Sequence, residues 1–409
     1  MMELIEKTAP VFTGINHTGK EDFSVVWDLG RRCTYACSYC GPHHSNKTSP
    51  LVDINKLKHT LDGVVEYSQL MDLYRKEPLR LDIAYTGGEP TIHPAFFEFV
   101  RYAKETYPFI RSNITTNGCY SEKKCREIMD CVNSTTLSYH AEGTPEQKKL
   151  VVANIKLMHE SGYNFRINHM FHKDYFDECI ELAEWFDELG ITYTSRPIGD
   201  SANKSDLLDG TAHEYTPNQL EYFKNQWTQK PKPKPKAPSG VMHMITTEKP
   251  KEKTSLETIG RPCCNGKCLS IKVDDKWTKG FRVPTTNFKG WNCMVNWDFL
   301  FINSELDGVW HHQTCQVNMD GQIGPIGKAS EFGPIIDKLR TTLRSGKMPV
   351  IRCPKTHCGC GLCSPKALND EDAKEIFDSR TQYLEPVFQE GVKDITKDAT
   401  VFRMFKEIK

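Results

Sequence analysis

Sixteen cysteines are distributed unevenly along this chain of 409 residues. Three lie in the segment 33–40, nine lie between residues 263 and 363, and four are scattered. The first residues lack the basic, apolar and small-residue pattern of an export signal, so we expect clustered cysteines to be metal ligands rather than disulfides. We expect the scattered four to be small buried residues of the core: Cys119, Cys125, Cys131 and Cys179.

The charge balance excludes several classes of protein. Lys plus Arg and Asp plus Glu each number 53, and the isoelectric point is about 7.2. This neutrality argues against a protein that coats nucleic acid or an anionic membrane. No run of 18 apolar residues occurs, which excludes a spanning helix, and the mean hydropathy is −0.54. We therefore expect a soluble cytoplasmic protein with no membrane or nucleic-acid partner.

Apolar and polar segments alternate between residues 23 and 195 in a pattern typical of strands followed by helices. The predicted strands are 23–27, 80–85, 112–115, 134–139, 165–170 and 191–195, and the predicted helices are 54–74, 95–104, 121–131, 145–161 and 176–189. Such alternation indicates parallel βαβ units. Because six strands are too few for an eight-fold barrel, we predict an α/β fold with a partial (β/α)6 TIM-like barrel and a C-terminal cysteine-rich α+β domain.

The composition also suggests where these parts begin and end. Residues 229–240 (QKPKPKPKAPSG) alternate Lys and Pro, favour polyproline II and cannot pack, so they form a linker. We place an N-terminal extension at 1–22, the barrel at 23–228, the cysteine-rich domain at 241–366 and a helical segment at 367–409.

The first cysteine cluster lies in the sequence RRCTYACSYCG, directly after the first predicted strand. Cys33, Cys37 and Cys40 are spaced as C-x3-C-x2-C, which puts three thiolates on one short loop. A structural zinc site or an ordinary ferredoxin cluster takes four protein ligands. An iron–sulfur cluster held by three thiolates instead leaves one iron open, which is a catalytic arrangement. A zinc site completed by a distant ligand is the alternative.

This loop resembles the signature of the radical S-adenosylmethionine (radical SAM) enzymes. The resemblance implies a 4Fe–4S cluster on Cys33, Cys37 and Cys40. It also implies that S-adenosylmethionine chelates the open iron and that Tyr39 lies against the adenine.

The string YTGGEPT, which ends the second predicted strand, also matches this family. Glycines let the backbone approach a ligand closely, and proline fixes the turn. The family resemblance implies that this segment binds the amino group of S-adenosylmethionine, through Gly87, Gly88, Glu89 and Pro90.

Polar residues at later strand ends extend the expected site. By the same resemblance, Asn117 and Ser138 face the ribose and methionine parts of the cofactor. His140 binds cofactor, faces substrate or is an ordinary rim histidine. Asn168, His169 and Arg196 either line the substrate side or make structural hydrogen bonds.

The second cysteine field contains a predicted hairpin turning at Asp307-Gly308, then a helix-like segment, and it ends in CPKTHCGCGLC. It resembles the SPASM and twitch domains of radical SAM maturases, which hold one or two auxiliary 4Fe–4S clusters. Further candidate ligands are Cys263, Cys264 and Cys268, and a structural zinc site is the alternative. The expected ligands are Cys293, Cys315, Cys353, Cys358, Cys360 and Cys363.

These features predict a radical SAM oxidoreductase that cleaves S-adenosylmethionine reductively and abstracts hydrogen from its substrate. The resemblance favours a peptide or protein substrate and implies an external electron donor such as flavodoxin or ferredoxin. A small-molecule substrate (a nucleoside, sugar or amino acid) and a non-catalytic zinc-binding interaction protein are the alternatives.

Overall fold

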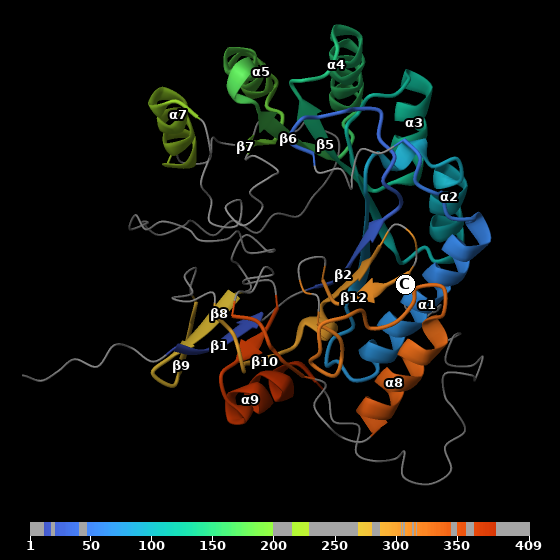
Figure 1. The fold of residues 1–409 in the computed structure, drawn as a ribbon, viewed down its shortest axis with the longest axis vertical. Coiled ribbons are helices and arrows are strands. Elements are labelled where there is room, and N and C mark those ends of the chain that lie inside the picture. Colours follow the sequence, from blue (N-terminus) through green and yellow to red (C-terminus); the bar gives the residue numbers. More distant parts are fainter. Residues whose placement is uncertain are drawn as a thin grey trace, which may run out of the picture.

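The computed structural model describes residues 12–17, 21–40, 47–198, 215–228, 269–279, 287–303, 305, 307–312, 315, 317–344, 350–356 and 364–381. Its main feature is a curved eight-stranded sheet in the order β12-β11-β2-β3-β4-β5-β6-β7. All neighbours from β11 to β7 are parallel. Helices cover the outer, convex side of this sheet (Figure 1), and the concave side is here called the lumen.

The elements of the barrel alternate along the chain. The strands are β2 (Asp22–Asp28), β3 (Arg80–Thr86), β4 (Arg111–Thr116), β5 (Ser134–His140), β6 (Phe165–Phe171) and β7 (Tyr193–Pro197). The helices are α1 (Ile54–Asp72), α2 (Phe96–Thr106), α3 (Glu122–Cys131), α4 (Pro145–Glu160), α5 (Phe176–Leu189) and α7 (Pro217–Thr228), with the 3-10 turns η1 (Pro90–Ile92) and η2 (Lys173–Tyr175). The predicted partial barrel is confirmed, although its last strand begins at Tyr193 rather than at residue 191.

Local sequence signals fix several of these boundaries. Asp53 caps α1 by accepting from the Asn55 backbone N–H at 2.8 Å. A capping box, formed by Thr144 and Gln147, starts α4. Gly190 ends α5 in the left-handed conformation, at φ 69°, which glycine adopts without strain.

Two strands from the C-terminal region complete the barrel sheet. They are β11 (Phe299–Ile302), which pairs parallel to β2, and β12 (Val309–Trp310), which pairs antiparallel to β11. The hairpin predicted around Asp307-Gly308 is confirmed, and it lies at the edge of the barrel. The 3-10 turn η4 (Val295–Trp297) precedes it, and α8 (Phe332–Arg344), the predicted helix-like segment, follows it and packs on α1.

A second sheet has the order β13-β10-β14-β1-β8-β9 and is here called the C-terminal sheet. Its strands are β1 (Phe12–His17), β8 (Leu269–Val273), β9 (Lys276–Lys279), β10 (Asn292–Cys293), β13 (Ile351–Arg352) and β14 (Lys366–Ala367), and α9 (Asp370–Arg380) follows β14. The strand β1, in the segment assigned from sequence to an N-terminal extension, pairs with β8 and β14. The domain boundaries themselves stay a prediction.

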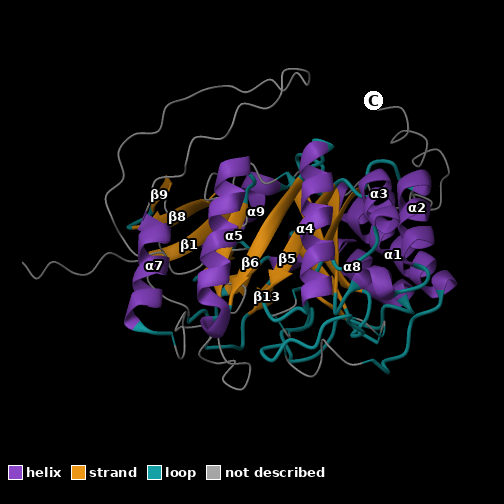
Figure 2. Cartoon of the chain, turned by 90° about the horizontal axis from the view of Figure 1, so that it is seen from above, coloured by secondary structure: helices purple, strands orange, loops and turns teal. Residues whose placement is uncertain are grey.

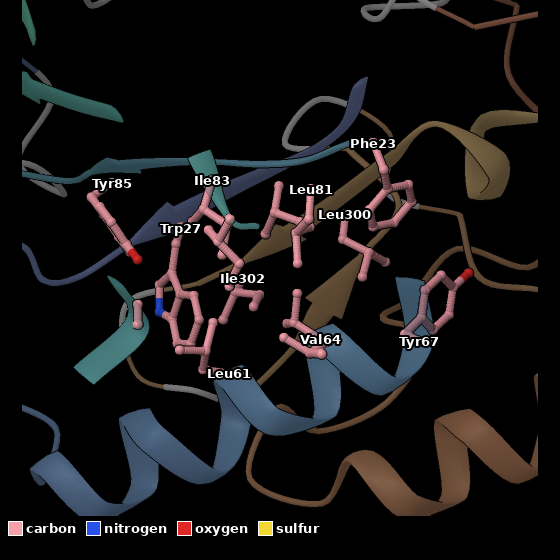
Figure 3. Close-up of a cluster of buried hydrophobic side chains, with 14 of the residues drawn as sticks. Phe23, Trp27, Leu61, Val64, Tyr67, Leu81, Ile83, Tyr85, Leu300 and Ile302 are labelled. Carbon is pink, nitrogen blue, oxygen red and sulfur yellow. The ribbon is translucent and has the colours of Figure 1, made fainter. Parts of the chain in front are cut away.

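The barrel core lies between the sheet and its helices. Figure 3 shows apolar side chains of β2, β3 and β11 meeting those of α1, for example Trp27, Leu300 and Val64. Because side chains alternate along a strand, the other set of side chains faces the lumen. That set is polar: Arg166 Nε donates to Thr136 Oγ1 at 2.9 Å. The sheet is therefore apolar toward the helices and hydrophilic toward the lumen, and Figure 2 shows the helices in a row along the outer face.

Within the described part of the chain, none of the helices combines the length and the apolar character needed to cross a bilayer.

Candidate functional site

The three-cysteine loop begins a few residues after β2, at the edge of the sheet where the parallel strands end. Cys33 Sγ accepts the backbone N–H of Tyr35 at 3.4 Å and the Asn117 side-chain amide at 3.6 Å. Burial raises the pKa of the Cys33 thiol, and it raises the pKa of Cys37 to about 12, to which the charges of Cys33 and Cys40 contribute.

The two glycines at the end of β3 press against the segment that leads into this loop. The backbone N–H of Gly88 donates to Gly30 O, and that of Glu89 donates to Arg32 O, both at 2.7 Å. A Cβ on Gly87, whose φ is +132°, would lie 2.4 Å from Gly30 O, and one on Gly88 would lie 2.3 Å from Arg32 O. Glycine is needed here for a backbone-to-backbone approach, and contact of these glycines with a cofactor remains a prediction.

Glu89 is buried and joins the ends of β3 and β4. Its Oε1 accepts from the Thr91 N–H at 3.1 Å and from the Thr91 hydroxyl at 2.7 Å. The Thr116 hydroxyl lies 2.8 and 2.9 Å from its two oxygens, and the Asn117 N–H donates to Oε2 at 2.8 Å. Burial raises the Glu89 pKa, and these donors oppose that shift. Pro90, the next residue, opens the turn η1. A role of Glu89 in binding an ammonium group stays a prediction.

We expect Glu89→Gln to lower the free energy of unfolding by about 1–3 kcal/mol. In either orientation of the new amide, its NH2 group faces a buried backbone N–H, that of Thr91 or that of Asn117. That N–H then loses its acceptor. Urea unfolding followed by circular dichroism measures the change. Glu98→Gln is the control, because Glu98 is mostly exposed and paired with Lys58. A Glu89→Gln chain as stable as the parent would rule out this network.

Four other residues expected at the site lie around the same edge of the sheet. Asn117 donates to the Thr34 hydroxyl at 2.9 Å, so it also fixes the three-cysteine loop. The Tyr39 hydroxyl is hydrogen-bonded to His140 Nδ1, and their rings stack with centroids 5.9 Å apart. Burial lowers the pKa of His140 to about 4, so the imidazole is neutral near pH 7. Ser138 is half-buried on the lumen face of β5.

Sequence reasoning missed several residues that hold the loop. The Glu142 carboxylate accepts from the Ser38 N–H at 2.8 Å and from the Ser38 hydroxyl at 2.6 Å. The Gln147 side chain donates to Thr34 O at 3.2 Å. Asp28, at the end of β2, accepts from the Gly30 N–H at 3.0 Å, and burial raises its pKa to about 6. Glu142 stands in the string HAEG, which carries no recognisable signal.

Of the residues expected on the substrate side, His169 lies elsewhere. It is fully buried, and its ring packs against Phe171 and Phe186, between the sheet and α5, where burial lowers its pKa to about 3. The expectation that it lines the substrate side is wrong, because its side chain lies on the outward face of β6, toward the helices. Asn168 and Arg196 lie on the lumen face of their strands, and Arg196 Nε donates to Asn168 Oδ1 at 3.2 Å.

The C-terminal sheet holds two of the predicted auxiliary ligands. Cys293 opposes Ile351 across β10 and β13, and the Cys353 N–H donates to Trp291 O at 2.9 Å. This register places Cys293 and Cys353 on one face of neighbouring strands, one diagonal step apart. Cys315 packs against the apolar cluster that contains Cys293. The remaining expected or candidate ligands lie outside the described residues: Cys263, Cys264, Cys268, Cys358, Cys360 and Cys363.

Comparison with known families agrees with the three-cysteine loop. Residues 27–207 match the family model of the Radical SAM superfamily. Residues 27–207 are a radical SAM domain. The match begins at the end of β2 and includes every strand of the barrel from β3 to β7.

Curated relatives share part of this radical SAM region. The AdoMet-dependent heme synthase of Methanosarcina barkeri is 23% identical over 178 residues, which are 41% of this chain and 47% of that protein. The GTP 3',8-cyclase of Chlorobaculum tepidum is 32% identical over 98 residues, 24% of this chain and 26% of that protein. The chain thus spans less than half the length of these relatives.

Two solved structures show a limited likeness. Streptococcus suis SuiB bound to S-adenosylmethionine is 15% identical, with a TM-score of 0.37 over 51% of this chain and 48% of that chain. Native anSMEcpe with bound AdoMet is 11% identical, with a TM-score of 0.41 over 76% of this chain and 80% of that chain.

A radical SAM domain implies S-adenosylmethionine and a 4Fe–4S cluster, and the residues of the three-cysteine loop fit such a cluster. The loop supplies three soft thiolate donors, and N–H groups of Tyr35 and Asn117 point at the Cys33 sulfur. Hydrogen bonds to cluster sulfurs are a standard means of setting a potential. In the described ranges, which include Cys33, Cys37 and Cys40, no three His, Cys, Asp or Glu side chains are gathered closely enough to hold a metal ion, so the fit rests on the donor chemistry of the shared loop and not on the placement of its three sulfurs.

Proposed function

We propose that this chain is a radical SAM enzyme whose 4Fe–4S cluster is held by Cys33, Cys37 and Cys40. When bound, the cluster and S-adenosylmethionine together supply a 5'-deoxyadenosyl radical that abstracts hydrogen from the substrate. The observation that carries the proposal is the close backbone contact, at one edge of the barrel, between the Gly87–Glu89 segment and the residues Gly30 and Arg32 that lead into the three-cysteine loop.

The protein's own residues would hold and shield the cofactors. Asn117 fixes the loop at Thr34, and the Glu142 carboxylate fixes it at Ser38. Tyr39 is oriented by the neutral His140, which supports a place for its ring against the adenine. Gly87, Gly88, Glu89, Pro90 and Ser138 would complete the S-adenosylmethionine site.

We also propose an auxiliary 4Fe–4S cluster in the C-terminal part of the chain. Cys293 and Cys353 on one face of the sheet support it, as does Cys315, which packs against the apolar cluster that contains Cys293. Cys358, Cys360 and Cys363 would supply further ligands. Metal analysis would distinguish an auxiliary iron–sulfur cluster from a structural zinc site. Visible absorption would do the same, because bound iron absorbs visible light and zinc does not.

The substrate we propose is a peptide or protein, by resemblance to maturases with similar cysteine-rich domains, and a flavodoxin or ferredoxin would donate the electron. A small anionic molecule is the second candidate. Two lumen arginines, Arg166 and Arg196, favour it, because a guanidinium binds carboxylate and phosphate groups well. Relatives named GTP 3',8-cyclase also favour it.

The test is formation of 5'-deoxyadenosine by the anaerobically reconstituted chain with dithionite and S-adenosylmethionine. We expect slow formation alone and faster formation with the peptide fraction of a cell extract, and protease treatment should remove that stimulation. Stimulation by the small-molecule fraction alone would favour the second candidate. No 5'-deoxyadenosine, from a chain with its iron in place, would contradict the proposed function.

A further inference from the structure

Arginines on the lumen face of the barrel sheet differ in their partners. At the beginning of β3, Arg80 Nη2 lies 2.6 Å from an oxygen of Asp22. At the beginning of β4, Arg111 Nε lies 3.8 Å from an oxygen of Asp82. An opposite charge at this distance offsets the field of a guanidinium. These two arginines are therefore ion-paired within the sheet itself.

Arg166 on β6 differs from them. It is exposed, and its Nε donates at 2.9 Å to the hydroxyl of Thr136, which lies directly opposite on β5. In the described part of the chain this is the one hydrogen bond of its side chain, and no carboxylate pairs with it. The lumen positions of β5, β6 and β7 hold hydroxyl, amide, imidazole, thioether and guanidinium groups and no acid. The terminal NH2 groups of Arg166 are therefore open to an anion.

The neighbouring lumen positions add further donors. The next lumen residue of β6 after Arg166 is Asn168, and Arg196 Nε on β7 donates to its Oδ1 at 3.2 Å. Asn168 lies opposite Ser138 on β5 and Thr194 on β7. Guanidinium and hydroxyl groups donate hydrogen bonds to the oxygens of carboxylates and phosphates. This half of the lumen therefore combines positive charge with several hydrogen-bond donors.

We propose that Arg166 binds an anionic group of the substrate, a carboxylate or a phosphate, on the lumen face of β6. This inference rests on the proposed function and deepens it, because it assigns a charge to the substrate whether that is a peptide or a small molecule.

The depth of Arg166 also limits where the substrate carries this anion. At the rim, Tyr39 of the three-cysteine loop contacts His140, which lies opposite Met170 on β6. Arg166 precedes Met170 by four residues, which is about 13 Å along the strand. Four extended residues span about the same length. A peptide substrate would therefore have its carboxylate within about four residues of the residue that is modified.

The experiment is calorimetric titration of the full, anaerobically reconstituted chain with two probes, sodium phosphate and sodium glutarate, at an ionic strength held constant with sodium chloride. We expect at least one probe to bind, and Arg166→Met should weaken that binding about tenfold or more, because the guanidinium is lost. Arg166→Lys, which keeps the charge without the planar fork, should give a smaller loss. The matched control is Arg111→Met, which removes an arginine already paired with Asp82 and should bind the probe as the parent does.

Tighter binding of glutarate would indicate a carboxylate on the substrate, and tighter binding of phosphate would indicate a phosphate; either result supports the proposal. If neither probe binds, or if Arg166→Met binds the probe as well as the parent, the proposal is overturned. If Arg166→Met does not fold, Arg166→Gln is titrated instead, with the same loss expected.

Two further measurements separate this site from the cofactor and from the proposed function. S-adenosylmethionine has a carboxylate of its own, so its affinity is measured on the same chains. A tenfold loss of that affinity in Arg166→Met would assign Arg166 to the cofactor and overturn the proposal. A parent chain that binds the probe through Arg166 but forms no 5'-deoxyadenosine would contradict the proposed function and leave the anion site in place.

Discussion

Alanine at Cys33, Cys37 or Cys40 should abolish reductive cleavage of S-adenosylmethionine while iron remains in the C-terminal part of the chain. The loop offers only these three thiols, so the loss of one leaves two ligands where three are needed. The effect is expected to be all-or-none, because a cluster that has lost a ligand neither assembles properly nor anchors the cofactor. Anaerobic assays of 5'-deoxyadenosine on each single variant, with iron per chain measured alongside, test this.

The control for this prediction is alanine at a cysteine elsewhere in the barrel. Cys125 on α3 and Cys179 on α5 are fully buried in apolar clusters. Their alanine variants should lose some stability and still cleave S-adenosylmethionine. Cleavage retained at the parent rate by any of the three loop variants would overturn the assignment of the cluster.

Asp298→Ala should lower the free energy of unfolding by about 3–5 kcal/mol, the usual cost of removing one member of a buried ion pair. Asp298 is fully buried, and its oxygens lie 2.6 and 3.2 Å from the guanidinium nitrogens of Arg380 on α9. Its charge also acts on the buried Arg75, which pairs with Asp72. The substitution leaves these cations buried with less negative charge. Urea unfolding followed by circular dichroism measures the loss.

Asp337→Ala on α8 is the matched control for this ion pair. Asp337 pairs with Arg340 at 3.0 Å, but 75% of its side chain is exposed. Pairs in water contribute little, so this variant should stay within about 0.5 kcal/mol of the parent. A loss below about 1 kcal/mol for Asp298→Ala would mean that the buried pair does not hold α9 to the barrel.

The repeating part of the fold could be predicted from sequence because its signals are local. Each strand from β2 to β6 is a short segment in which buried positions alternate with less buried ones, and helices such as α1 and α4 have their own apolar spacing and N-cap. The pairings of β1 and β11 could not be predicted in this way. β1 pairs with residues about 350 positions later in the chain, and β11 completes a sheet that begins with β2. Nothing in a short window of sequence records such long-range partners.

The same distinction between local signals and long-range contacts applies to the candidate site. The spacing of Cys33, Cys37 and Cys40 lies within one loop, so the sequence alone indicates a shared metal centre. Glu142 is more than 100 positions from Ser38, and only the fold brings them together. The prediction for His169 was wrong because the face of the sheet on which a side chain lies depends on the alternation along the strand. In β6 this alternation turns His169 away from the lumen and toward Phe186.

The most direct test of the account is iron and sulfide per chain after anaerobic purification, for the parent beside the Cys33, Cys37 and Cys40 triple alanine variant. We expect about eight or twelve irons per chain, falling by about four in the variant, with the auxiliary iron retained. Equal iron in the two chains, or no iron after reconstitution, would contradict it.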